Sequence, residues 1–173
     1  MRVPRTFVFV DISGFTNFTN ENGDDAAGRL LASWRAVTRD VASETGVRIA
    51  KWLGDGCMIV AVDQRDAITF ALELQKRSGA ACAPLSIRVG MASGLALLFE
   101  GDDYIGTAVN MAARLCDAAG SFEVIIPSEH IENLPEGVVA TPHESMSLRG
   151  LNEAIPVVSL TGEATNAARN DTG

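Results

Sequence analysis

Apolar and polar positions alternate in a way that predicts strands and helices along the first half of the chain. Residues 6–12 (TFVFVDI) are rich in β-branched and aromatic side chains and predict a buried strand. Residues 22–45 carry apolar side chains at helical spacing behind an Asn-Gly-Asp-Asp start, and they predict a long amphipathic helix. Two apolar runs, 47–52 and 57–62, flank LGDG at 53–56, and Asp-Gly between strands is typical of a hairpin.

The next elements complete a recognisable order. A helix is predicted at 67–74 and strands at 84–91 and 95–99, followed by a turn at 100–103. Up to Gly94 the order is β-α-β-β-α-β. This order predicts an α+β fold with a ferredoxin-like core, in which helices cover one face of an antiparallel sheet.

The remaining pattern predicts an extension of this core within one domain, residues 1–162. The polar residues 163–173 lose the apolar pattern and are predicted to form a disordered tail. The extension consists of a helix at about 106–119 and strands at 122–126, near Val138 and at 155–160.

Composition narrows the classes of partner. The 173 residues include 14 Lys and Arg against 22 Asp and Glu, a net charge of −8, and 47% of them are hydrophobic. This is the composition of a globular protein, and its acidic surface repels phosphate backbones, so we expect no nucleic-acid partner. A polyanionic substrate would need positive charge supplied locally, and metal ions are the obvious source.

The cysteines and the longest apolar run indicate the cellular compartment of the domain. Cys57, Cys82 and Cys116 are odd in number and far apart, so they form neither a CxxC zinc motif nor a complete disulfide framework. The longest near-apolar run, 91–99, is about half the roughly 18 residues of a membrane helix. We therefore expect a cytoplasmic domain without direct membrane insertion.

Two aspartates stand out because of where the predicted strands place them. Asp11 lies where the first strand ends, and Asp55 lies at the hairpin tip. In a βαββαβ sheet these two points share one edge, and paired carboxylates without His or Cys suit Mg²⁺ or Mn²⁺. The alternative is that each Asp only ends a strand or fills a turn.

The helix predicted at 106–119 has two stripes. Val109, Ala112 and Cys116 can pack on the sheet, while Asn110 and Arg114 point outward. An amide and a guanidinium one turn apart can hold a sugar and a phosphoryl oxygen, although such a pair is also common on solvated surfaces.

Two further charged residues offer a base-reading chemistry. Lys51 can donate to the ring nitrogen N1 of adenine, and Asp103 can accept from its 6-amino group. Guanine presents the opposite pattern at that edge. Either residue taken alone also fits a solvated strand or turn charge.

Three segments that carry these residues resemble class III nucleotidyl cyclases. They are FVDISGFT at 9–16, KWLGDG at 51–56 and DYIGTAVNMAARL at 103–115. Together with the strand at 87–90 and the closing strands, the resemblance covers roughly residues 5 to 160. It implies a catalytic domain that converts ATP to 3′,5′-cyclic AMP and pyrophosphate with two divalent cations, Mg²⁺ or Mn²⁺.

The resemblance also implies roles for individual residues. Asp11 and Asp55 match the family's metal-binding aspartates, and the backbone carbonyl of Ile12 matches an additional metal ligand. Lys51 and Asp103 match its adenine-selecting pair.

Further positions match the parts of the family's site that handle sugar and phosphates. Asn110 matches the residue that orients the ribose, and Arg114 the one that stabilises the transition state. Amides near Phe15 and Thr16, at a helix start, can hold triphosphate oxygens. Arg149 is the candidate cation for the triphosphate, where a Lys is more usual, and a solvated turn residue is its alternative.

In this family two catalytic domains form the site head to tail. Because the chain carries both sets of residues, the resemblance implies a homodimer with two equivalent sites. The stretch between Gly94 and Asp103 is shorter than the dimerisation arm of many relatives. Two alternatives stay open: a guanylyl cyclase of the same fold, and a nucleotide-binding regulatory module that does not catalyse.

Overall fold

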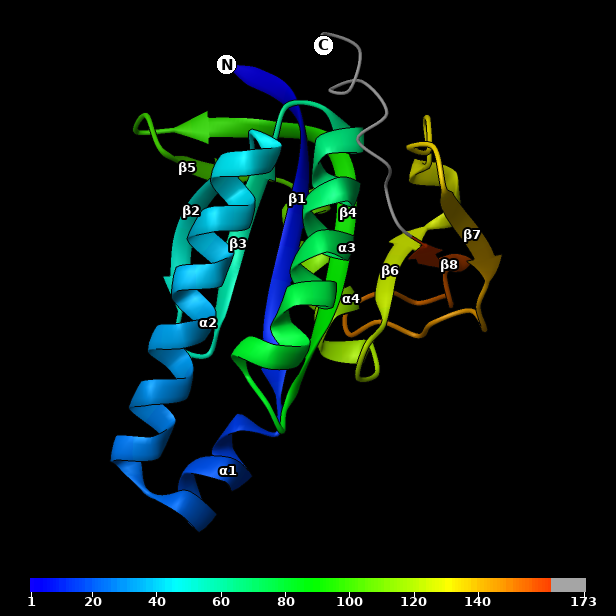
Figure 1. The fold of residues 1–173 in the computed structure, drawn as a ribbon. Helices are drawn as coiled ribbons and strands as arrows, with labels where there is room; N and C mark the ends of the chain where they lie inside the picture. The colour runs from blue at the N-terminus through cyan, green and yellow to red at the C-terminus, as the bar shows by residue number, and fades with distance from the viewer. Residues whose placement is uncertain (163–173) are drawn as a thin grey trace, which may run out of the picture.

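A computed structural model describes residues 1–162, which form an eight-stranded sheet with helices on both faces (Figure 1). The predicted tail, 163–173, lies outside the described residues. The strands are β1 (Arg2–Ser13), β2 (Arg48–Leu53), β3 (Gly56–Ala61), β4 (Ser86–Phe99), β5 (Asp103–Ile105), β6 (Val124–Pro127), β7 (Val138–Pro142) and β8 (Val157–Gly162). The helices are α1 (Phe15–Asn22), α2 (Asp24–Thr45), α3 (Gln64–Ala81), α4 (Thr107–Ala118) and the short 3₁₀ helix η1 (Ser128–His130).

The strand order confirms the predicted α+β fold with a ferredoxin-like core. The order in the sheet is β2-β3-β1-β4-β6-β8-β7, and β5 pairs with β4 outside this path. The four core strands, β2, β3, β1 and β4, pair antiparallel. β6 then joins β4 in parallel, so the complete sheet is mixed.

Both faces of β1 are apolar, and each is covered by a different set of helices. Val8, Val10 and Ile12 face the larger core, to which α2 contributes the fully buried Trp34. As predicted for the core helices, α2 and α3 share this face (Figure 1). Phe7 points to the other face, because successive side chains of a strand alternate. There α4 packs on β1, β4 and β6.

The two strands predicted at 84–91 and 95–99 are wrong as separate elements, since β4 runs without a break from Ser86 to Phe99. Gly94 does not end the strand. A Cβ built on it would lie 3.1 Å from the Cβ of Ala108, so the glycine allows α4 to approach closely. The predicted turn before Asp103 is present, and it leads into β5, which the sequence pattern did not predict.

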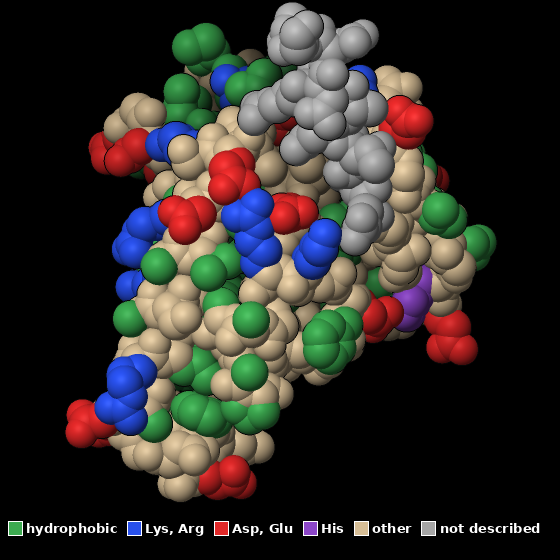
Figure 2. Space-filling model, viewed as in Figure 1, with side chains coloured by type: hydrophobic (Ala, Val, Ile, Leu, Met, Phe, Trp, Pro, Cys, Tyr) green, Lys and Arg blue, Asp and Glu red, His purple; other side chains and the backbone are tan. Residues whose placement is uncertain are grey.

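Charges of both signs are interspersed on the face that carries α2 and α3 (Figure 2). Among the described residues, no helix has the length and apolar character needed to cross a bilayer.

Gly90 fixes how closely α4 lies on the sheet. A Cβ at this position would lie 2.1 Å from the backbone nitrogen of Cys116 and 2.4 Å from the carbonyl oxygen of Ala112. Backbone atoms of a helix cannot give way as a flexible side chain can. Only glycine therefore permits the observed contact between β4 and α4.

We predict that Gly90→Ala destabilises the domain by about 1–3 kcal/mol, because α4 must shift to admit the methyl group. Gly79→Ala is the matched control, since nothing lies within 4 Å of a Cβ at that helical position. It should instead stabilise the domain by roughly 0.5–1 kcal/mol. Urea unfolding of both variants measures the two effects, and equal midpoints would contradict this account of the packing.

Candidate active site

Asp11 and Asp55 lie together at one edge of the sheet. The N–H of Ile12 donates to the carbonyl of Asp55 over 3.1 Å, and Asp11 is the register partner of Gly56. A Cβ on Gly56 would lie 2.5 Å from the carbonyl oxygen of Val10, so this glycine lets the hairpin approach β1. A cavity of about 390 Å³ opens here, lined by Asp11, Ile12, Ser13, Gly14, Phe15, Thr16, Asn17, Asp55 and Arg88.

The electrostatics of this edge suit a cation. Burial raises the pKa of Asp55, and the negative charge of Asp11 raises it further, whereas a backbone hydrogen bond and Arg88 oppose the shift. The Oδ1 atom of Asp11 is buried and has no hydrogen-bond partner among residues 1–162. A divalent cation between the carboxylates would satisfy this atom and remove their repulsion.

The number of carboxylates indicates how a cation would be held. Within the described part of the chain, no group of three or more His, Cys, Asp or Glu side chains could hold a metal ion. Mg²⁺ commonly takes one or two carboxylates and completes its shell with waters and substrate phosphates. Asp11 and Asp55 fit that pattern better than a closed structural site.

Arg88 is a member of this site that the sequence analysis did not single out. Its Nη2 and Nε atoms donate to Oδ2 of Asp11 over 2.6 and 3.1 Å, and its Nη1 atom donates to the carbonyl of Asp117 over 2.9 Å. Arg88 reaches Asp11 because the two residues are register partners on β4 and β1. Its charge compensates one carboxylate, and its side chain lines the cavity.

Phe15 and Thr16 lie in the first turn of α1, at the same cavity. Gly14 precedes them with φ 78°, a left-handed conformation that favours glycine, and no side chain caps the helix. The first amides of a helix have no carbonyl partner inside it. This turn therefore presents N–H groups beside the two carboxylates, as phosphate binding requires.

Lys51 and Asp103 form an ion pair, with 2.9 Å between Nζ and Oδ1. The side chains are 45% and 49% exposed. The hydrogen bond from Lys51 lowers the pKa of Asp103, and the N–H of Tyr104 adds to this effect. The structure thus brings together two residues that lie 52 positions apart in the sequence.

A β-bulge in β2 places the side chain of Lys51 on the face of the sheet where Asp103 lies. Ile49 pairs with Ile59 and Lys51 pairs with Met58, so Ala50 is an extra residue on its strand. Directly paired residues share a face of the sheet, and Met58 belongs to the cluster on the α4 face. Without the bulge Lys51 would point to the opposite face.

Asn110, Arg114 and Arg149 do not line the cavity that Asp11 and Asp55 share. Asn110 is exposed on α4, whose inner positions Ala112 and Leu115 are buried. Arg114 lies against the exposed turn that carries Arg149, because a Cβ on the adjoining glycine would meet its guanidinium at 2.8 Å. The sugar- and phosphate-holding candidates thus face outward from the sheet.

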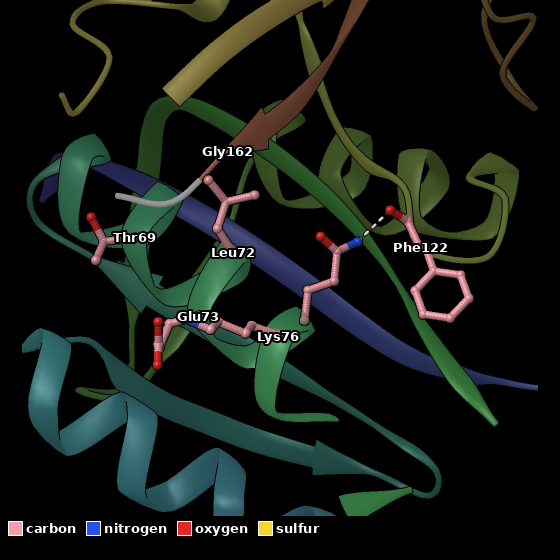
Figure 3. Close-up of a pocket in the computed structure, with 7 residues that line it drawn as sticks. Thr69, Leu72, Glu73, Lys76, Phe122 and Gly162 are labelled. Carbon is pink, nitrogen blue, oxygen red and sulfur yellow. Dashed lines mark hydrogen bonds between the residues drawn. The ribbon is translucent and has the colours of Figure 1, made fainter. Parts of the chain in front are cut away.

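A separate cavity of about 340 Å³ contains none of the predicted site residues (Figure 3). It lies along α3, and Gln75 on its wall donates a hydrogen bond to the carbonyl of Phe122. Among the described residues on its wall, Glu73 is the one carboxylate and no glycine-rich turn is present. The site residues predicted from the sequence therefore lie outside this cavity.

Comparison with known proteins identifies the family. The family model described as the adenylate and guanylate cyclase catalytic domain matches residues 4–161, and the chain belongs to this family. An uncharacterized protein of Mycobacterium tuberculosis is 32% identical over 152 residues, which are 88% of this chain and 40% of that protein. An adenylate cyclase of Streptomyces coelicolor is 31% identical over 126 residues, 73% of this chain and 33% of the relative. The chain thus spans well under half the length of these relatives.

Solved structures share the fold. The adenylyl cyclase CyaB from P. aeruginosa superimposes with a TM-score of 0.82 at 23% identity, over 100% of this chain and 98% of that one. The guanylate cyclase domain of RhGC from Catenaria anguillulae, in complex with GTP, gives a TM-score of 0.80 at 20% identity, over 94% and 99% of the two chains. The fold alone thus does not distinguish the two substrates.

We predict that Asp55→Asn stabilises the metal-free domain at neutral pH. The pKa of Asp55 is raised in the folded state above its ordinary value of 3.8. The folded state therefore loses stability as the pH rises from 3.8 through the pKa that Asp55 has in the folded protein. The variant cannot ionise at this position and escapes that loss. Urea unfolding from pH 3 to pH 8 should give similar stabilities at the acidic end and a growing advantage for the variant above it.

Added Mn²⁺ serves as the control for this measurement. A cation that binds the folded site should stabilise the unmodified chain and not the Asp55→Asn variant. Parallel pH profiles for the two proteins would show that the carboxylates do not interact as the geometry requires.

Proposed function

We propose that the domain is an adenylyl cyclase, which converts ATP to 3′,5′-cyclic AMP and pyrophosphate with two divalent cations. The observation that carries the proposal is the convergence of Asp11 and Asp55, with a buried unpartnered oxygen, beside the uncapped start of α1. Carboxylates for cations and amides for phosphate oxygens are the two components that a nucleoside triphosphate requires.

The proposed mechanism assigns a task to each residue. Asp11, Asp55 and the carbonyl of Ile12 would hold the cations, which supply charge neutralisation and a more acidic 3′-hydroxyl. The amides of Phe15 and Thr16 would bind triphosphate oxygens. The 3′-hydroxyl gives its proton to solvent water as its oxygen bonds to the α-phosphorus. The bond between the α-phosphorus and the bridging oxygen breaks, and pyrophosphate leaves with that oxygen.

Residues on and near α4 would complete the reaction. Asn110 would orient the ribose, so that the 3′-oxygen lies in line with the leaving group. Arg114 would stabilise the charge that develops on the nonbridging oxygens of the α-phosphate. Arg149, in the turn beside Arg114, would supply a further cation for the triphosphate.

Adenine is favoured over guanine by Lys51 and Asp103. The ion pair presents an N–H donor and a carboxylate acceptor side by side, which complements N1 and the 6-amino group of adenine. Guanine would place an N–H against Lys51 and a carbonyl against Asp103. This pair is the observation that favours the adenylyl over the guanylyl cyclase.

The direction of α4 supports a head-to-tail homodimer. Its inner side chains pack on the sheet that carries Asp11, so the exposed Asn110 points away from the carboxylates of its own chain. A second copy can bring its carboxylates to this outer face. Two copies would then form two equivalent sites.

We predict that the chain turns over ATP at least about tenfold faster than GTP with Mn²⁺, because mispaired polar groups penalise guanine. Lys51→Glu combined with Asp103→Ser should reduce ATP turnover more than GTP turnover. Asp11→Ala should reduce turnover of ATP roughly a hundredfold or more while leaving the fold intact. A preference for GTP would overturn the assignment of the base, and an active Asp11→Ala variant would overturn the metal site.

We also predict that two inactive variants restore activity when mixed. In a mixture of Asp11→Ala and Arg114→Ala, half the dimers are mixed and each mixed dimer has one complete site, which gives roughly a quarter of the unmodified activity. Asp11→Ala mixed with Asp55→Ala is the matched control, because both changes fall in the same half of the site. Failure of the first mixture with folded proteins would refute the head-to-tail arrangement.

A further inference from the structure

We propose that Arg35 of α2 is a positioning residue for the carboxylate of Asp55. This inference rests on the proposed function, because it concerns the proposed cation site. The Nη2 atom of Arg35 donates to the carbonyl of Gly54 over 2.8 Å. Gly54 directly precedes Asp55 in the hairpin, so this hydrogen bond holds the backbone at the residue next to the carboxylate.

The guanidinium of Arg35 is itself fixed by aromatic packing. Its central carbon lies 4.7 Å from the centroid of the Trp52 ring. Trp52 in turn meets the fully buried Trp34 edge to face, with 6.0 Å between ring centroids. A stacked, planar guanidinium has lost much of its freedom before it donates, which makes the hydrogen bond to the hairpin more effective.

The hairpin tip is held on its other side by contacts with β1. Ile12 donates to the carbonyl of Asp55, and Gly56 packs against the carbonyl of Val10. These contacts fasten Asp55 and the residue that follows it. Gly54 has φ 62°, a left-handed conformation that favours glycine. The one hydrogen bond described for its carbonyl comes from Arg35 of α2.

Arg35 acts on Asp55 through the backbone rather than through its charge. The charges that shift the pKa of Asp55 are those of Asp11 and Arg88. Loss of Arg35 should therefore loosen the orientation of the carboxylate and leave Asp11 and Arg88, the charges that shift its pKa, in place. A cation bound by two carboxylates is sensitive to such loosening, because both must point to the same place.

Arg39 provides a matched control on the same helix. Its guanidinium carbon lies 5.1 Å from the centroid of the same Trp52 ring. Within residues 1–162 it makes no hydrogen bond to the hairpin. Replacing Arg39 thus removes a cation from Trp52 but leaves the carbonyl of Gly54 bound.

The test compares Arg35→Met, Arg35→Lys and Arg39→Met in the full chain. Mn²⁺ binding is measured from the electron paramagnetic resonance of free Mn²⁺, and turnover of ATP is measured against Mn²⁺ concentration. Arg35→Met should raise the Mn²⁺ concentration for half-saturation roughly three- to tenfold, the effect of one lost hydrogen bond, while kcat at saturating Mn²⁺ stays within about twofold. Arg35→Lys should recover only part of the affinity, because lysine keeps an N–H donor but not the planar guanidinium that packs on Trp52, and Arg39→Met should match the unmodified chain.

Three outcomes would overturn the inference or its foundation. Unchanged Mn²⁺ binding in folded Arg35→Met would overturn the role of Arg35 and leave the metal site standing. An equal shift in Arg39→Met would assign the effect to the packing of Trp52. Equal Mn²⁺ binding by the unmodified chain and Asp11→Ala would defeat the metal site itself. If circular dichroism shows that Arg35→Met does not fold, Arg35→Gln carries the same expectation.

Discussion

Two carboxylates held close to each other impose the main constraint on this structure. Asp11 and Asp55 converge at one edge of the sheet, and their repulsion and burial raise the pKa of Asp55. The ion pair from Arg88 to Asp11 offsets part of this cost. The hydrogen bond from the N–H of Ile12 to the carbonyl of Asp55 keeps the two acids together despite their repulsion. Such stored electrostatic cost is expected where a protein reserves a place for a cation.

One face of the sheet carries most of the apolar core, and the other face carries the polar residues of the candidate site. The face under α2 and α3 is a continuous apolar core and accounts for much of the buried surface. The face under α4 carries Asp11, Arg88 and Lys51, and it is covered by one helix that packs on β1, β4 and β6. A single helix leaves room for polar groups to remain partly exposed. The same face therefore serves as a packing surface and, in the proposed function, as the place where a nucleotide and a second copy would bind.

Much of the fold could be predicted from the sequence because its signals are local. The alternation of apolar residues, the LGDG turn and the helical spacing of α2 and α4 each depend on neighbours within a few positions. The meeting of Asp11 and Asp55 also followed, since βαββαβ order places the end of the first strand and the hairpin tip at one edge. Family resemblance added the remaining roles, which stay proposals.

Other features depend on strand register and on contacts between distant segments. The pairing of Arg88 with Asp11 requires the β1–β4 register, and the direction of Lys51 requires a bulge of one residue at Ala50. The hydrogen bond from Arg35 to the carbonyl of Gly54 requires α2 to place Arg35 beside the β2–β3 hairpin. The sequence by itself determined most of the elements and their order, although it did not reveal β5 or the continuity of β4. Only the tertiary structure decided which side chains meet, because a shift of one residue in register moves a side chain to the opposite face.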